Sequence, residues 1–100
     1  MYEYKAKVIN IIDGDTLDLE IDLGFYVSIK IRARLLEVNT PERGDSEFAS
    51  AKALLATLIE KNKDLGGFIN IKTQKTEKYG RWLVYIDNIN NVLKERWPYV

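Results

Sequence analysis

The sequence predicts an α+β fold that is mainly β: a five-stranded barrel with one helix between the third and fourth strands. Residues 17–35 alternate between apolar and polar side chains on both sides of Gly24, with the period of two that is typical of half-buried β-strands. Residues 45–63 repeat their apolar side chains with the period of an α-helix instead. One strand-like segment precedes the two strands within residues 17–35, and two more follow the helix. This order suits a barrel of the OB type.

The two strands within residues 17–35 are expected to form a hairpin. If residues 24–26 make a three-residue loop, Leu19 lies opposite Ile31 on one face, and Asp18 lies opposite Arg32 on the other. Pairs of opposite charge contribute a few tenths to about 1 kcal/mol each, and a shift of one residue would turn charges toward the core. We therefore expect one face of the ribbon to be buried along its length: Leu17, Leu19, Ile21, Leu23, Val27, Ile29, Ile31, Ala33 and Leu35.

The same register brings polar residues together at the end of the ribbon away from the hairpin loop. Thr16 is set opposite Arg34. Asp15 and Arg34 are separated by 19 positions in the sequence, and this pairing makes them spatial neighbours. The sequence therefore predicts a polar cluster there, next to a turn at Asp13 and Gly14.

The remaining elements follow from local patterns. We expect a first strand over residues 4–12 and two later strands over residues 68–74 and 81–86, followed by a short helical turn over residues 92–96. Asp45 or Ser46 can cap a helix that runs to about Lys63. The expected buried stripe of this helix is Phe48, Ala51, Leu55, Leu58 and Ile59.

The composition restricts the chemistry. The chain of 100 residues, a usual length for one domain over residues 1–100, contains neither cysteine nor histidine. This excludes disulfides, thiolate or imidazole metal ligands, and a Ser-His-Asp triad. Proton transfer would fall to carboxylates, lysines or tyrosines, and a metal site would use oxygen ligands, which favour calcium, magnesium or manganese.

The charge distribution bears on partners. The net charge is zero, but residues 1–24 carry six acidic and two basic side chains, whereas residues 25–100 carry 13 basic and nine acidic ones. A polyanionic substrate would therefore need local basic patches or a bound cation. No apolar run approaches a membrane span, and no signal peptide opens the chain. We expect no membrane partner, a monomer, and a cytoplasmic location, or a secreted one if a leader was removed.

Four polar clusters interrupt the core pattern. They are Asp13-Gly14-Asp15-Thr16, Arg34, Asn39-Thr40-Pro41-Glu42 and Lys78-Tyr79-Gly80-Arg81. Each cluster alone is typical of a turn, a loop or a solvated strand position. Their order and spacing together resemble the staphylococcal nuclease (thermonuclease) family, in which a helix separates the Thr-Pro-Glu loop from the Lys-Tyr-Gly-Arg segment. The resemblance covers residues 8–86.

The resemblance implies a metal-dependent nuclease that cuts DNA or RNA with little sequence preference. By its motifs, Asp15 matches the carboxylate that binds calcium, with Asp13 nearby, while Asn39 and Thr40 fall at the rest of the metal site. Manganese or magnesium are alternatives to calcium.

The same resemblance assigns the residues around the phosphate. Arg34 and Arg81 match two phosphate-clamping arginines, and Glu42 matches the carboxylate proposed to activate water. Lys78 and Tyr79 match substrate-contacting residues.

These roles make chemical sense for phosphodiester hydrolysis. A hard cation can polarise the phosphate, two guanidinium groups can bind its oxygens, and a glutamate can serve as the base when no histidine exists. Two departures from the family bear on activity. Asn39 stands where the family usually has an aspartate ligand, and the chain is short after the last strand, where Trp97-Pro98-Tyr99 can act as an apolar lid.

Three functions follow. A nuclease weakened or altered in metal preference is the first. A nucleic-acid-binding OB module that lost turnover is the second, because Arg34, Lys78, Tyr79 and Arg81 can still grip a single strand. A protein-interaction module is the third, since OB barrels also serve that role.

Overall fold

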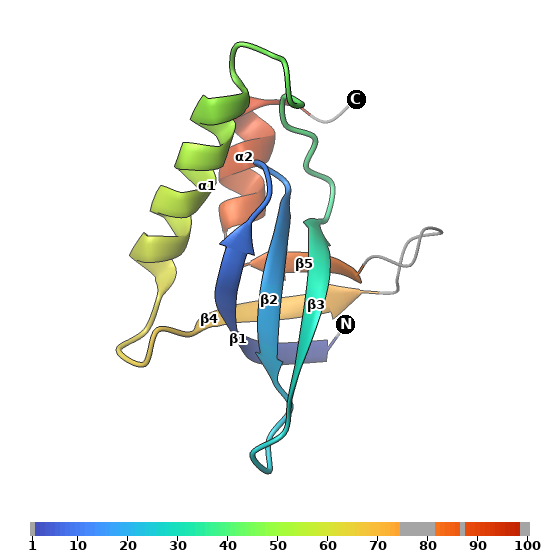
Figure 1. Ribbon diagram of the computed structural model, residues 1–100, viewed down its shortest axis with the longest axis vertical. Helices are drawn as coiled ribbons and strands as arrows, with labels where there is room; N and C mark the ends of the chain where they lie inside the picture. The colour runs from blue at the N-terminus through green and yellow to red at the C-terminus, as the bar shows by residue number, and fades with distance from the viewer. Residues whose placement is uncertain (1, 75–81, 87, 99–100) are drawn as a thin grey trace.

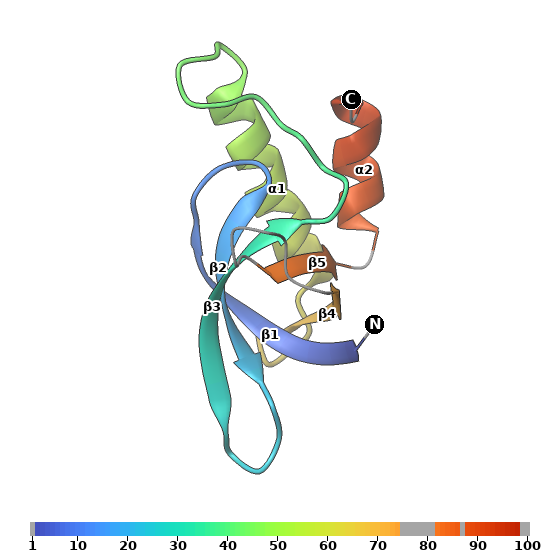
Figure 2. The same cartoon turned by 90° about the vertical axis from the view of Figure 1, so that its right-hand side faces the viewer.

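The computed structural model describes residues 2–74, 82–86 and 88–98. Its strands form a closed barrel in the order β1-β2-β3-β5-β4, with two helices at one end (Figures 1 and 2). The elements are β1 (Tyr2–Ile11), β2 (Thr16–Asp22), β3 (Ser28–Leu35), α1 (Phe48–Asn62), β4 (Ile69–Gln74), β5 (Trp82–Ile86) and α2 (Ile89–Arg96). The predicted five-stranded barrel, with its helix between the third and fourth strands, is confirmed.

The β2–β3 hairpin has the predicted register. Leu19 pairs with Ile31, Asp18 pairs with Arg32, and Thr16 pairs with Arg34. The Asp18 carboxylate also accepts a hydrogen bond of 2.9 Å from Nε of Arg32, an exposed pair on the outer face. The alternation of side chains thus determines both the pairing and which face turns inward.

The prediction that this face is buried along its whole length is wrong at the hairpin end. Leu23, Val27 and Ile29 are 40%, 52% and 41% exposed. The ribbon extends past the rest of the barrel, as Figure 1 shows, and β3 pairs with β5 only over residues 33–35. Among the described residues, no opposing layer therefore buries the inner face of the tip.

Helix α1 packs its expected stripe against the barrel. Ala51, Leu55 and Ile59 are buried, whereas Phe48 and Leu58 are only partly so. The predicted cap at Asp45 or Ser46 is wrong: the helix is preceded by Glu47, and no side chain caps it. Asp45 instead accepts the backbone N–H of Glu47, at 2.9 Å, in the turn before the helix. Neither helix is of a length and apolarity to cross a membrane, within the part of the chain that is described.

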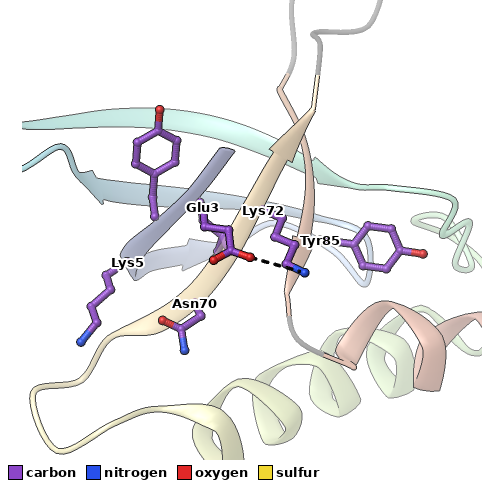
Figure 3. A pocket seen from close by; sticks show the side chains of 7 residues that line it. Glu3, Lys5, Asn70, Lys72 and Tyr85 are labelled. Atoms are coloured by element: carbon purple, nitrogen blue, oxygen red, sulfur yellow. Dashed lines mark ion pairs between the residues drawn. The ribbon is translucent and has the colours of Figure 1, made fainter. Parts of the chain in front are cut away.

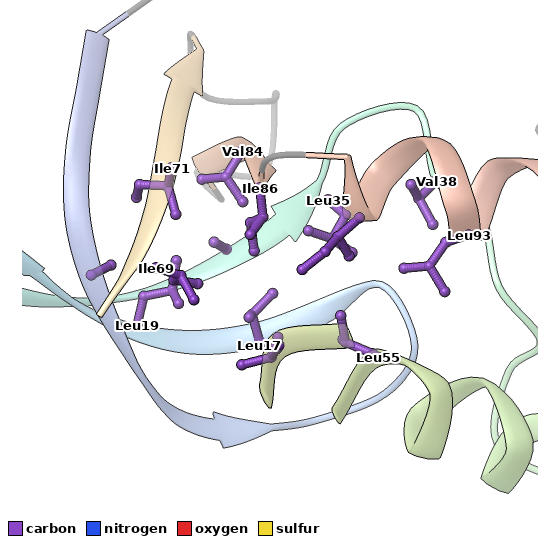
Figure 4. Close-up of a cluster of buried hydrophobic side chains, with 14 of the residues drawn as sticks. Leu17, Leu19, Leu35, Val38, Leu55, Ile69, Ile71, Val84, Ile86 and Leu93 are labelled. Carbon is purple, nitrogen blue, oxygen red and sulfur yellow. The ribbon is translucent and has the colours of Figure 1, made fainter. Parts of the chain in front are cut away.

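The C-terminal helix is longer than the predicted turn over residues 92–96. It begins at Ile89, which is buried, and Leu93 on the next turn is buried as well. Both join one core cluster with the inward residues of the strands and with Leu55 of α1 (Figure 4). The two helices thus cover the barrel end where the β1–β2 turn and the β3–α1 connection meet (Figure 2).

Candidate active site

The turn between β1 and β2 is shaped by its own polar groups. Asp13 Oδ1 accepts the backbone N–H of Asp15 at 3.0 Å, and the backbone N–H of Ile12 donates to Thr16 O at 2.9 Å. Gly14 lies against the neighbouring segments, since a Cβ there would come within 2.6 Å of Thr40 Oγ1. Only glycine allows this approach, which brings the turn against the β3–α1 connection.

Asp15 is the centre of the polar cluster, and its residue is only 7% exposed. Its Oδ1 accepts the hydroxyl of Thr16 at 3.0 Å, and its Oδ2 accepts the backbone N–H of Thr40 at 3.3 Å. Nη2 of Arg34 lies 3.6 Å from Oδ2. The carboxylate therefore joins three segments that are distant in sequence: the first turn, β3 and the following connection.

Arg34 is held in place from two sides. Its Nη2 donates to the carbonyl oxygen of Val38 at 3.1 Å, besides its contact with Asp15. The backbone is also fixed, because the N–H of the next residue, Leu35, donates to Asp15 O at 2.8 Å. About a quarter of the Arg34 side chain, 26%, remains exposed. The guanidinium is thus oriented before any substrate binds, yet solvent still reaches it.

Burial makes Asp15 an unusual carboxylate. Desolvation, together with the hydrogen bond and charge of Asp13, raises its pKa to about 6, although the Thr40 N–H and Arg34 act in the opposite direction. For Asp13, burial opposes ionisation, but hydrogen bonds with Asp15 and Thr16 hold its pKa below the usual value. The two adjacent carboxylates therefore disfavour full ionisation of Asp15, and a nearby cation would relieve this.

The connection after β3 supplies the other predicted residues. Thr40 is buried, and its Oγ1 has no hydrogen-bond partner among the described residues. Asn39 and Glu42 are exposed, and with Thr40 they line an open hollow of about 580 Å³, together with Trp97 and Pro98 of the C-terminal segment. Trp97 and Pro98 thus flank this loop, where the sequence suggested an apolar lid.

The structure brings some predicted residues together and leaves others apart. Asp15, Arg34 and Thr40 are in contact, whereas Glu42 shares the hollow with Asn39 and Thr40, and neither Asp15 nor Arg34 lines it. The predicted residues Lys78, Tyr79 and Arg81 lie outside the described residues.

Comparison with known proteins bears on this geometry. Over 81 residues, 81% of the chain, it is 30% identical to a protein named ParB from Escherichia coli and 27% identical to a micrococcal nuclease from Shigella flexneri. These matches show that the chain is a distant homologue of the staphylococcal nuclease family. It spans about two fifths of the length of these curated relatives, 40% and 41%. No family model matches it.

The residues present fit the oxygen-ligated cation that the nuclease family implies. The negative charge of this set of ligands is reduced, because Asn39 stands where the family usually has an aspartate. The Asp15 carboxylate contacts the buried Thr40, and Asp13 hydrogen-bonds to Asp15. The Thr40 hydroxyl has no hydrogen-bond partner among the described residues. Among the described residues, no three acidic side chains lie together in a group that could hold a metal ion. Calcium accepts carboxylate, amide and carbonyl oxygens together with water, so this donor set remains suitable for a hard cation.

If hollows were ranked by volume alone, the candidate site would lie elsewhere on the molecule. A wider hollow of about 730 Å³ lies on β1, β4 and β5, where Lys5, Asn70 and Tyr85 line it and Lys72 Nζ lies 3.5 Å from Glu3 (Figure 3). None of the motif residues that the structure describes takes part in it. The family motifs, not the volume, identify the candidate site.

Two contributors to the site were missed by the sequence analysis. The Val38 carbonyl orients Arg34, but a backbone acceptor leaves no signature in the side-chain pattern. Gly14 is required for the close approach to Thr40 and Ala51, a role that its position in an Asp-Gly turn only hinted at. Both act by placing groups that the motifs had already identified.

Proposed function

We propose that this chain binds nucleic acid and hydrolyses its phosphodiester bonds with the help of a divalent cation, calcium first and manganese or magnesium as alternatives. The observation that carries the proposal is the contact between Asp15, Arg34 and Thr40. A buried carboxylate beside a second one costs folding free energy unless a cation or other partner compensates it. A buried pair of carboxylates that lowers stability in this way is better explained by function than by packing.

Asp15, Asn39 and the Thr40 carbonyl are proposed to hold the cation, with Asp13 beside them. The bound cation would supply polarisation of the phosphate oxygens. Arg34 is proposed to bind the same phosphate and to stabilise the charge that develops on it. Its hydrogen bond to Val38 O fixes its orientation in advance, which is the arrangement that favours charge stabilisation in a transition state.

Glu42 is proposed to accept a proton from water as the water oxygen forms its bond to phosphorus and the bond to the leaving sugar oxygen breaks. This proposal is supported by the hollow that Glu42 lines together with Asn39 and Thr40, two of the proposed cation ligands. Arg81 is proposed as the second phosphate clamp, and Lys78 and Tyr79 as substrate contacts, on the basis of the family motif.

A nucleic-acid-binding module without turnover is the second candidate. The neutral Asn39 and the lack of a third converging carboxylate, within the described residues, favour it, because both weaken cation binding. In that case Arg34 would bind phosphate while no reaction followed.

A gel assay separates these functions. Single-stranded DNA and RNA are incubated with the protein in calcium, magnesium, manganese or chelator, and binding is measured under the same conditions. We expect cleavage with at least one cation and none in chelator, and an Arg34→Ala variant should lose it. Binding without cleavage under every cation would favour the binding module, and absence of both would contradict the proposed function.

A further inference from the structure

Asn90 on the first turn of α2 is a buried polar residue whose side-chain amide uses both its oxygen and its nitrogen in hydrogen bonds. It is 1% exposed, and its Oδ1 accepts the backbone N–H of Ile86 at 3.0 Å. Its Nδ2 donates to the carbonyl oxygens of Leu36 at 3.0 Å and Val84 at 3.1 Å. One amide group thus links α2, β5 and the segment that follows β3.

The segment that Asn90 contacts has a constrained backbone. Leu36 also donates its N–H to Val84 O at 2.9 Å, and the next residue, Glu37, has φ of +58°. Side chains other than glycine rarely adopt this conformation, and it persists where surrounding contacts hold it. Lys94, one turn beyond Asn90, provides a further contact through its Nζ, 3.1 Å from Glu37 Oε2.

The site contacts come directly after this turn. Val38, two residues beyond Leu36, accepts the hydrogen bond from Arg34, and Thr40, four residues beyond it, donates to Asp15. Val38 also belongs to the same buried cluster as Leu93 of α2 (Figure 4). The chain between the Asn90 contact and the site is therefore too short to absorb much movement.

We propose that Asn90 is a positioning residue for the site formed by Asp15, Arg34 and Thr40. Its amide holds the Leu36 carbonyl, and this fixes the turn at Glu37 so that Val38 O meets Arg34 and the Thr40 N–H meets Asp15. Asn90 itself touches none of these three residues among its recorded hydrogen bonds. The effect of Asn90 on the positions of Val38 and Thr40 does not depend on the proposed function. Only the effect of Asn90 on turnover rests on that function.

The first test is made without metal or substrate. Asn90→Asp keeps the acceptor for Ile86 N–H and replaces both donors, while Ile71→Val removes one buried methylene from distant β4 as a control. NMR should show that Asn90→Asp shifts the Arg34 side-chain signal and lowers hydrogen-exchange protection of the Thr40 amide at least tenfold relative to the Leu19 amide. Ile71→Val should move the two amides together. A folded Asn90→Asp with unchanged Arg34 and Thr40 signals would overturn the proposal.

A second measurement uses the parent protein, in case Asn90→Asp does not fold. Under increasing denaturant, the amides of Thr40 and Ile86 should exchange through one shared opening, because Asn90 links their segments. An opening of Thr40 that leaves Ile86 protected would contradict the proposed link.

The third measurement concerns turnover on single-stranded DNA. If the proposed function holds, Asn90→Asp should lower kcat at least tenfold with KM changed less than threefold, whereas Ile71→Val should keep both. An equal loss in both variants would assign Asn90 a purely structural role. If the parent cleaves nothing, the proposed function fails while the NMR results still decide the positioning role.

Discussion

The two ends of the β2–β3 ribbon have opposite characters. At the end near the helices, Asp15, Thr16 and Thr40 are polar and buried, and they bond to one another or to Arg34. At the hairpin end, apolar side chains are exposed, with Phe25 at 96%. Folding alone favours the reverse arrangement, because burying polar groups costs free energy and burying apolar ones gains it.

This contrast separates two kinds of exception to the core pattern. Helix α1, the β3–α1 connection and the turn at Gly14 enclose the polar end. These contacts keep its polar groups away from water, which costs folding free energy. The hairpin end has no such enclosure within the described part of the chain, because β3 pairs with β5 only over residues 33–35. An enclosed polar cluster therefore points to chemistry more strongly than an exposed apolar tip does.

The largest expected effect is on turnover at the polar end. Glu42→Gln keeps the shape of the side chain and removes the proposed base, so it should lower kcat on single-stranded DNA by about 100- to 1000-fold with little loss of binding. Glu47→Gln, the same change nearby in the same connection, should leave kcat within about twofold. Tighter binding by Glu42→Gln, with no cleavage in the parent to lose, would support the binding module.

The second effect concerns stability along β2. Leu19 is fully buried and Leu23 is 40% exposed, although both face the same side of the ribbon. Leu19→Ala should lower the free energy of unfolding by about 2–5 kcal/mol, and Leu23→Ala by less than about 1 kcal/mol. Denaturant unfolding measures both. Equal losses would mean that the hairpin end is covered in solution.

A third effect concerns cation binding. Asn39→Asp adds a carboxylate beside Thr40 and should strengthen calcium binding, on the order of tenfold, because charges in a partly buried site are weakly screened. Titration calorimetry measures the affinity, and Asn70→Asp on distant β4 serves as the control. If Asn39→Asp binds calcium no better than the control, Asn39 lies outside the cation ligands.

The smallest effect is expected at the tip of the hairpin. Phe25 has positive φ and almost no contact with the rest of the molecule. Phe25→Ser should change the free energy of unfolding by less than about 0.5 kcal/mol. A larger loss, seen by thermal or denaturant unfolding, would show that the tip packs against something in solution.

Sequence alone predicted the register of the ribbon, because charges and apolar residues alternate on both strands. That register placed Arg34 opposite Thr16, and the contact between Arg34 and Asp15 followed from it. Alternation identifies the inward face but not how far the next layer extends, so the exposure of Val27 and Ile29 was not foreseen.

Other parts of the site lay beyond the sequence for a related reason. The Val38 carbonyl is a backbone group, and the Asn90 side-chain amide binds a backbone carbonyl. Every residue carries such backbone groups, so no side-chain pattern reveals which of them are used. The sequence analysis did not single out Asn90, and only packing shows that it is buried. Glu42 shares a hollow with Thr40 that neither Asp15 nor Arg34 lines, so its expected place beside the cluster stays a prediction.

If Asp15 binds a cation as proposed, its carboxylate is kept buried at the expense of stability. Thermal unfolding of the parent and of Asp15→Asn, each in chelator and in saturating calcium, tests it directly. The amide of Asn can still accept the Thr40 N–H but carries no charge to desolvate. In chelator the variant should therefore gain about 1 kcal/mol, or roughly 4–8 °C in Tm. Calcium should raise the Tm of the parent and leave that of the variant unchanged. A variant that is less stable in chelator, together with a parent that does not respond to calcium, would contradict the claim.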